Sequence, residues 1–215
     1  MVKSKTAIEL RGAVHLDQLQ PQVAATIAAN SDGFFPVAGE SAFWVEVSPG
    51  MVVNRLMDVA LKTCDVTPGA LITERHYGTM EVHGPDQGQV FQAGAAILSE
   101  IGSQIEDQMR PTVLIDEVIR KLTSHHASLI NRTRAGMLVL ADDTLYTLEV
   151  TPAVHILAAA NVAEKTSPIR LVGLGSDGAV GRLRLAGTDA EIDMAVEAVR
   201  RVISEIPGKL AQGAL

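Results

Sequence analysis

The chain has 215 residues, of which 25 are acidic and 18 basic, so its formal net charge at pH 7 is −7. Hydrophobic residues make up 47% and charged residues 20%, which excludes wholesale disorder, and the 3% of aromatic residues leaves the core to Ala, Val, Ile and Leu. The acidic balance argues against nucleic acid or an anionic membrane surface as the main partner.

The cysteine content and the first residues bear on the compartment. Cys64 is the single cysteine, which excludes an intramolecular disulfide and a cysteine-based metal cage within one chain. The basic segment 1–5 runs into Ile8-Glu9-Leu10-Arg11 and not into an apolar signal core, and no apolar run approaches the ~18 residues of a membrane span. We therefore expect a soluble cytoplasmic protein with no membrane partner.

The first half of the chain predicts a small unit of helices and strands. Residues 42–47 are rich in aromatic and β-branched side chains, which favours a strand. After Ser48-Pro49, apolar residues recur from Val53 to Cys64 at helical spacing. The predicted elements are, in order, strand 7–13, helix 21–29, strand 42–47, a helix after Ser48-Pro49, strands 71–73 and 79–83, and a helix after Gly84.

The second half predicts the same order of elements. Thr188 is the expected cap of the last helix, whose apolar stripe begins at Ile192. The predicted elements are strand 112–114, helix 116–130, strand 145–150, a helix after Thr151-Pro152, strands 169–174 and 182–186, and a helix after Gly187.

The two halves are an internal repeat. A shift of 103 positions carries Glu46-Val47-Ser48-Pro49 onto Glu149-Val150-Thr151-Pro152 without a gap, and carries Gly78 onto Gly181. The sequence therefore predicts two tandem domains, residues 1–103 and 104–215. Because no flexible linker separates them, we expect the copies to pack side by side.

The usual signatures of catalysis and metal binding are weak. Residues 173–178 satisfy G-x-G-x-x-G, but an alternating strand pattern follows where a dinucleotide site needs a helix, so we predict a turn. Adjacent His125 and His126 point to different helix faces and predict no metal site, and Asp142-Asp143 is interpreted as a hairpin turn. Cys64 is interpreted as a buried structural thiol. We expect no catalytic residue and no cofactor.

One connection concentrates polar chemistry. Residues 73–77 join two predicted strands with Glu74, Arg75, a histidine and a tyrosine, whereas the matching stretch from Ser176 in the second copy is small and flexible. The connection is either a surface hairpin turn or, in a symmetric assembly, a loop repeated around an axis.

These residues carry a family resemblance. The chain resembles bacterial microcompartment shell proteins of the tandem, circularly permuted branch, whose trimers are able to stack face to face in carboxysomes and metabolosomes. The strand-Glu-Val-[Ser/Thr]-Pro-helix passages, which end at Lys62 and Lys165, are similar to the shell-domain helix with its tile-edge lysine. The sequence Glu74-Arg75-His76-Tyr77-Gly78 looks like the Glu-Arg pore gate, and the segment from residues 16–22 to residues 45–47 resembles the front of this branch.

The resemblance implies an α/β (α+β) fold of two permuted ferredoxin-like modules, with antiparallel sheets flanked by helices, in a pseudohexameric trimer. Lys62 and Lys165 would contact neighbouring tiles, and Glu74 and Arg75 would gate a central pore. The expected partners are further copies of the chain, other shell proteins and small polar metabolites, in the shell of a microcompartment. The residues expected beside the pore are Thr73, His76, Tyr77, Ser176, Asp177 and Gly178.

The Glu-Arg gate is expected to be nearly balanced. A partly solvated pair contributes ~0.2–1 kcal/mol, so three pairs leave a small preference for the closed state, and Glu74→Ala is expected to favour the open one. Asp177 and Gly178 depart from the gate pattern and are interpreted as leaving space in the pore. Two alternatives stay open: a trimeric ferredoxin-like small-molecule sensor, and an enzyme with its site between the copies.

Overall fold

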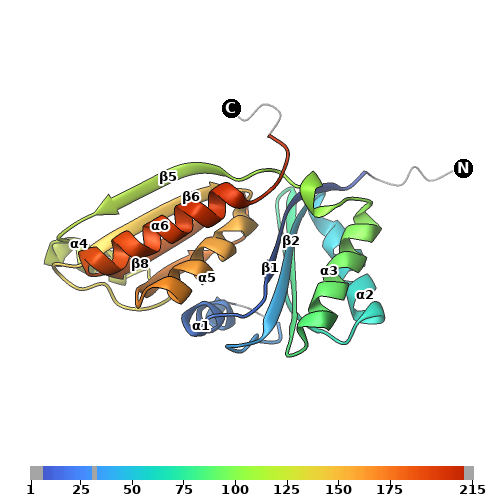
Figure 1. Cartoon of the computed structure of the whole chain (residues 1–215), viewed down its shortest axis with the longest axis horizontal. Coiled ribbons are helices and arrows are strands. Elements are labelled where there is room, and N and C mark those ends of the chain that lie inside the picture. Colours follow the sequence, from blue (N-terminus) through green and yellow to red (C-terminus); the bar gives the residue numbers. More distant parts are fainter. Residues whose placement is uncertain (1–6, 31–32, 211–215) are drawn as a thin grey trace, which may run out of the picture.

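The computed structural model describes residues 7–30 and 33–210, so the basic segment 1–5 lies outside it. Two four-stranded antiparallel sheets stand side by side, with strand orders β1-β2-β4-β3 and β5-β6-β8-β7 (Figure 1). The first module contains β1 (Glu9–Leu16), α1 (Pro21–Asn30), β2 (Ser41–Ser48), α2 (Val53–Thr63), β3 (Thr67–Glu74), β4 (Tyr77–Gly84) and α3 (Gln87–Ile101). The second contains β5 (Thr112–Ile119), α4 (Ser124–Asn131), β6 (Thr144–Thr151), α5 (Ile156–Thr166), β7 (Arg170–Gly175), β8 (Gly181–Gly187) and α6 (Asp189–Glu205).

The repeat in the sequence is also a repeat in the structure. A shift of 103 residues carries the bounds of β1, β2 and α2 onto those of β5, β6 and α5. It also carries the short 3-10 helix η1 (Gly50–Val52) onto η3 (Ala153–His155). A further 3-10 turn, η2 (Ile105–Asp107), lies in the connection between the modules. Residues 103 apart can therefore be compared as occupants of one structural position.

The predicted helix 116–130 is wrong in its first half. Strand β5 continues to Ile119, and α4 begins only at Ser124, where the Thr123 hydroxyl caps it by accepting a 3.3 Å hydrogen bond from the His126 amide. Apolar and β-branched side chains fill β5, and the strand pairs along its length with β6. The apolar residues of this segment are spaced in a way that fits both a helix and a strand. The hydrogen-bonded pairing with β6 stabilises the strand.

Several local predictions are confirmed. Thr188 caps α6 in a capping box with Glu191, and Cys64 is buried. The glycine motif is a turn, because β7 ends at Gly175, Gly178 has a positive φ of 81° and the strand β8 follows. Asp142 adopts a positive φ in a turn before β6, but this turn follows α4 and its loop and joins no two strands, so the predicted hairpin there is wrong.

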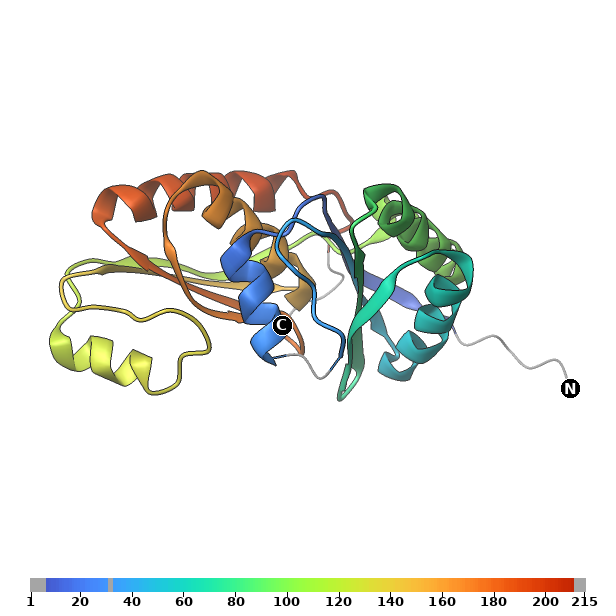
Figure 2. The same ribbon diagram turned by 90° about the horizontal axis from the view of Figure 1, so that it is seen from below.

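Each sheet carries a pair of helices on one face. Helices α2 and α3 pack together over the first sheet, and α5 and α6 over the second (Figure 1). Figure 2 shows α1 and α4 on the opposite side of the molecule from α6. Within the described ranges, no helix is long and apolar enough to cross a membrane.

The two modules share a core along a continuous seam. Helix α1 leaves its own module and packs against α5 and β7 of the second. Glu164 on α5 accepts hydrogen bonds from the Gln22 and Val23 amides at 2.8 and 3.0 Å, so its carboxylate caps the first turn of α1. Val14, Leu16 and Trp44 belong to the same apolar cluster as the core of the second module. The seam is therefore packed as an interior, not as a loose domain contact.

Candidate functional site

The β3–β4 turn carries the charged residues singled out in the sequence. Glu74 and Tyr77 are paired across the hairpin, and Arg75 and His76 form its two-residue tip. Arg75 has a φ of +54°, the sign that the favoured two-residue hairpin turns take at their first central position. Thr73, Glu74, Arg75 and His76 are exposed and Tyr77 is half-buried.

The corresponding β7–β8 loop lies beside this turn. Ser176 is half-buried, Asp177 is exposed and Gly178 is buried. The carboxylate of Glu74 lies against the Cα of Gly178, where a side chain would overlap with it. The structure thus brings Glu74 together with Gly178 across the seam, although 104 positions separate them.

Glu74 and Arg75 do not form an ion pair in the single chain. Both side chains are described, and neither lies within 4.0 Å of an oppositely charged group among residues 7–30 and 33–210. The described residues of the same chain therefore supply no charged partner for Arg75.

Tyr77 anchors the base of the hairpin to a buried ion pair. The Arg11 guanidinium lies 3.7 Å from the centre of the Tyr77 ring, a cation–π contact, and its Nε donates a 2.6 Å hydrogen bond to Glu46 Oε1. Glu46 Oε2 in turn accepts a 3.0 Å hydrogen bond from the Val154 amide of η3. This chain of contacts connects the hairpin to the seam.

Burial governs the electrostatics of this cluster. It raises the pKa of Glu46, while the Arg11 guanidinium and the amides of Val154 and Ala153 favour the carboxylate and oppose that shift. The sequence analysis did not identify Arg11 and Glu46 as a pair. The available signal was a glutamate that recurs, as Glu46 and Glu149, inside otherwise apolar strands.

A second buried polar pair occupies the same sheet. His83 Nδ1 lies 3.0 Å from Glu81 Oε1, and both side chains are almost fully buried. Gly69 leaves room for the carboxylate, because a Cβ there would overlap with Glu81. The second module has Arg184 and Ala186 at these positions, so the pair belongs to the first module alone.

The two lysines lie at equivalent positions. Lys62 and Lys165 are exposed in the last turns of α2 and α5, where a cation is favoured by the helix dipole. Lys62 Nζ also donates a 2.8 Å hydrogen bond to Asp58 one turn earlier. Searched over the described residues, the side chains form no group of three or more metal-ligating His, Cys, Asp or Glu.

Comparison with known proteins places this architecture in a class. The family described as CsoS1D N-terminal domain matches residues 10–107. The carboxysome shell protein CcmP of Synechococcus elongatus is 42% identical over 94% of this chain and 95% of its own length. The carboxysome shell protein CsoS1D of Hydrogenovibrio crunogenus is 42% identical over 93% and 98%.

Solved structures agree over the whole fold. A double ringed trimeric shell protein from the RMM microcompartment superposes with a TM-score of 0.91 at 37% identity, covering 95% of this chain and all of that one. A fused permuted hexameric shell protein from the same microcompartment gives 0.91 at 36% identity, covering 94% and 99%. The fold and its two modules are those of a tandem, permuted microcompartment shell protein. The chain belongs to the CsoS1D and CcmP family of bacterial microcompartment shell proteins.

Proposed function

We propose that three copies of this chain form a pseudohexameric shell tile with a gated central pore, and that the tile passes small polar metabolites without catalysing a reaction. The modules would be residues 1–103 and 104–215. The observation that carries the proposal is the geometry of the seam. It joins β1 and α1 of the first module to η3, α5 and β7 of the second, so two different faces meet head to tail.

Both faces of the seam have free counterparts. The counterpart of β1 and α1 is formed by β5 and α4, and that of η3, α5 and β7 is formed by η1, α2 and β3. Gly12 is buried against Val154 in the seam, whereas its counterpart Ile115 is 37% exposed. Val154 is fully buried and its counterpart Met51 is 70% exposed. Positions that are buried at the seam in one copy therefore carry exposed apolar side chains in the other.

A head-to-tail contact of this kind closes into a ring when its rotation permits. Joining β5 and α4 of each chain to η1, α2 and β3 of the next would repeat the seam three times between chains and cover these side chains. The residues that cap the helices differ between the seam and the proposed contact between chains. Leu61 stands where Glu164 caps α1, and α4 needs no such carboxylate because Thr123 already caps it.

The ring would bring the polar turns together. Glu74 and Arg75, with Thr73, His76 and Tyr77 beside them, would face the threefold axis and act as the gate. Ser176, Asp177 and Gly178 would line the same opening. Lys62 and Lys165 would lie on the outer edge and contact the next tile. Relatives named as shell proteins support this function over the sensor or the enzyme.

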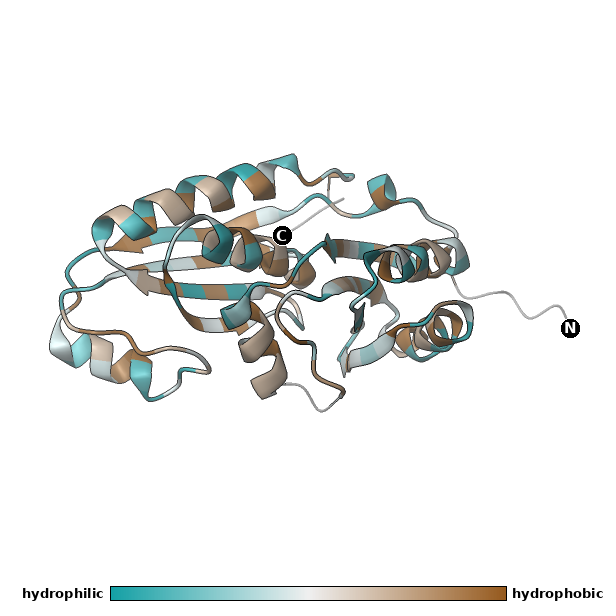
Figure 3. Ribbon diagram, turned by 60° about the horizontal axis from the view of Figure 1, so that its bottom comes forward, coloured by the Kyte–Doolittle hydropathy of each residue, from teal (hydrophilic) through white to brown (hydrophobic). Residues whose placement is uncertain are grey.

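An apolar surface supports stacking of two such trimers. The loop after α1 exposes Phe34, Phe35 and Val37, and the equivalent loop after α4 exposes Met137, Leu138 and Leu140. Both loops lie on the side of the molecule that carries α1 and α4 (Figure 2), and Figure 3 shows their hydrophobic stretches. Exposed apolar groups of this size mark interaction surfaces.

The native mass tests the proposal. Light scattering should give about 68 kDa, three times the 22.8 kDa of one chain, or twice that value if trimers stack. Leu114→Asp on the free face of β5 should give a folded monomer, whereas Lys62→Ala should leave the mass unchanged. A wild-type monomer at micromolar concentration would contradict the proposal.

A further inference from the structure

We propose that the pore loops are joined between subunits by an ion pair, with the carboxylate of Asp177 facing the guanidinium of Arg75 of the partner subunit. The inference rests on the trimer proposed above. It identifies a charged partner for the gate arginine, and it assigns Asp177 a positioning role.

The two pore loops occupy equivalent positions. The shift of 103 residues carries Glu74 onto Asp177 and Arg75 onto Gly178. The second loop is longer, because β7 ends at Gly175 whereas β3 runs to Glu74, but Arg75 and Gly178 both have a positive φ, of 54° and 81°. Each loop therefore presents an acidic residue followed by a residue in the left-handed conformation.

The contact seen within the chain shows how the loops meet. At the seam, the acidic residue of the first loop, Glu74, faces the left-handed residue of the second, Gly178. Repeating the seam between chains places Asp177 in the role of Glu74. The partner subunit's Arg75 then takes the role of Gly178. The same juxtaposition that is neutral within a chain becomes an acid facing a base between chains.

The side-chain lengths fit this exchange. A Cβ at position 178 would overlap with the carboxylate of Glu74, so glycine is required opposite a glutamate. Arg75 does carry a Cβ, and an acid as long as glutamate would meet the same overlap. Asp177 is one methylene shorter and leaves room for a longer basic side chain. The acidic residue is therefore the longer glutamate where it faces a glycine, and the shorter aspartate where it would face an arginine.

The charges are free to form the pair. Arg75 and Asp177 are both exposed, and neither makes an ion pair within 4.0 Å in the described parts of the single chain. Opposite charges facing each other at a subunit contact favour one register of association. Around the axis, three acid–base contacts between chains would alternate with three contacts within chains in which Glu74 faces a glycine.

Oxidative cross-linking tests the pair. In a Cys64→Ser background, Asp177→Cys and Arg75→Cys are introduced together, and the protein is oxidised and run on a denaturing gel. Serine at 64 is the natural residue of the second copy, at position 167. The inference predicts covalent species of two and three chains, because the new cysteines face each other across subunits. The two single variants are the controls and should stay at the mass of one chain.

The outcomes separate the pair from the trimer. A native trimer whose doubly substituted chains stay uncoupled would overturn the ion pair and leave the tile intact. A wild-type protein that is not a trimer in solution would contradict both the proposed shell tile and the proposed ion pair.

A charge experiment decides the question if the cysteine variant does not fold. Hydrogen exchange of residues 74–78 is compared in the trimers of wild type, Asp177→Asn and the matched variant Glu74→Gln. Asp177→Asn should speed exchange by roughly 1.4- to 5-fold and abolish its salt dependence, because a solvated pair is worth ~0.2–1 kcal/mol. Glu74→Gln should keep the salt dependence. The reverse pattern would overturn the inference.

Discussion

Glu46 and Val154 connect the two modules, since Glu46 Oε2 accepts a 3.0 Å hydrogen bond from the Val154 amide across the seam. The other carboxylate oxygen is held by Arg11 at 2.6 Å, and both side chains are buried. A buried carboxylate is thus shared between a guanidinium of its own module and the first turn of η3. The pair fixes the register of the seam, which also sets where the β3–β4 and β7–β8 turns meet.

Glu46→Ala should destabilise the fold by about 3–5 kcal/mol, because it leaves Arg11 buried without a counter-charge. Urea denaturation followed by circular dichroism measures the change. Lys62→Ala removes an exposed ion pair with Asp58 and should cost less than about 1 kcal/mol. If the two variants lost the same free energy of unfolding, the buried Arg11–Glu46 pair would contribute no more to stability than an exposed ion pair.

Glu149→Ala should weaken association and leave the fold intact. Glu149 is the counterpart of Glu46, and it pairs with Arg182 at 2.9 Å in a partly exposed position. In the proposed trimer its carboxylate would accept from the Met51 amide of the partner subunit, a bond to a charged group worth about 1.5–3 kcal/mol. Sedimentation over a range of concentrations should show a raised dissociation constant. An unchanged constant would place Glu149 outside the interface.

Much of the fold could be predicted because the sequence is an internal repeat, so each half can be compared with the other. The constant shift of 103 residues predicted the equivalence of α2 with α5 before any coordinates, and the capping residue Thr188 has a strong local signature. Strand β5 was predicted in part as a helix because its apolar residues fit both periods. The exposure of Ile115 on β5 is understood only when the other copy shows Gly12 packed against Val154 at the same position.

The site itself depends on contacts that no local pattern encodes. The turn that carries Glu74 and Arg75 was identified from its unusual composition. Its contact with Gly178 comes from the packing of the two modules and not from sequence spacing. The Arg11–Glu46 pair likewise forms between strands and is completed by Val154 from the second module.

Two buried histidines should give opposite pH dependences. Burial lowers the pKa of His155 to about 4, helped by the nearby Arg11 charge and only partly opposed by the Met109 carbonyl. The folded state therefore excludes a proton that the unfolded chain binds below pH 6.5. About 3 kcal/mol of stability, present above pH 6.5, is lost as pH falls toward 4. His155→Gln should remove this loss in urea titrations at pH 4 to 8.

His83 should act in the other direction. Burial alone lowers its pKa, but the hydrogen bond and charge of Glu81 outweigh burial and raise it, and burial also raises the pKa of Glu81. The folded pair thus holds protons more tightly than the unfolded chain. The stability that the pair contributes is fully present at low pH. It is lost as the pH rises through the pKa values of the folded state, which lie above 4.5 for Glu81 and above 6.5 for His83. His83→Gln should flatten the decline between pH 6 and 8, and a steeper decline would contradict the assignment.

Tyr146→Phe should stabilise the protein. No described group gives the buried Tyr146 hydroxyl a hydrogen bond of ordinary geometry, although burial and the nearby Asp116 charge raise its pKa. Asp116 is instead held by two hydrogen bonds from Arg200, at 2.8 and 2.9 Å.

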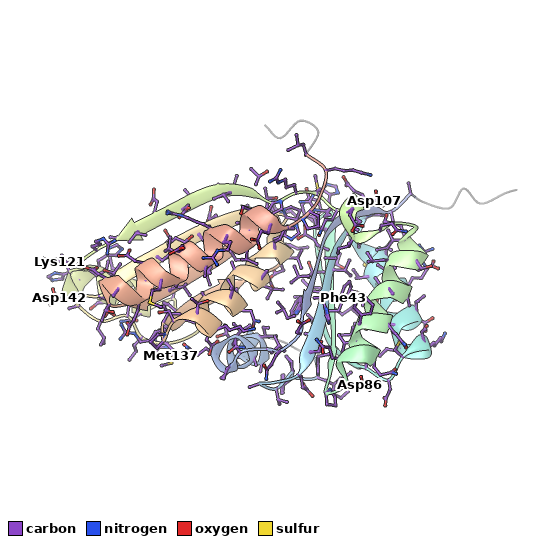
Figure 4. The ribbon with its side chains drawn as sticks, viewed as in Figure 1. Phe43, Asp86, Asp107, Lys121, Met137 and Asp142 are labelled. Atoms are coloured by element: carbon purple, nitrogen blue, oxygen red, sulfur yellow. The ribbon has the colours of Figure 1, made fainter. Side chains whose placement is uncertain are left out.

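The first module already contains the apolar alternative, because Phe43 stands at the position of Tyr146 (Figure 4). Removing a buried donor without a partner relieves part of a penalty of about 1–3 kcal/mol, so thermal unfolding should shift upward. Phe43→Tyr is the reciprocal variant and should lower the melting temperature, because a hydroxyl there enters an apolar cluster. A clear loss of stability in Tyr146→Phe would show that the hydroxyl is satisfied, with an ordered water as the natural partner.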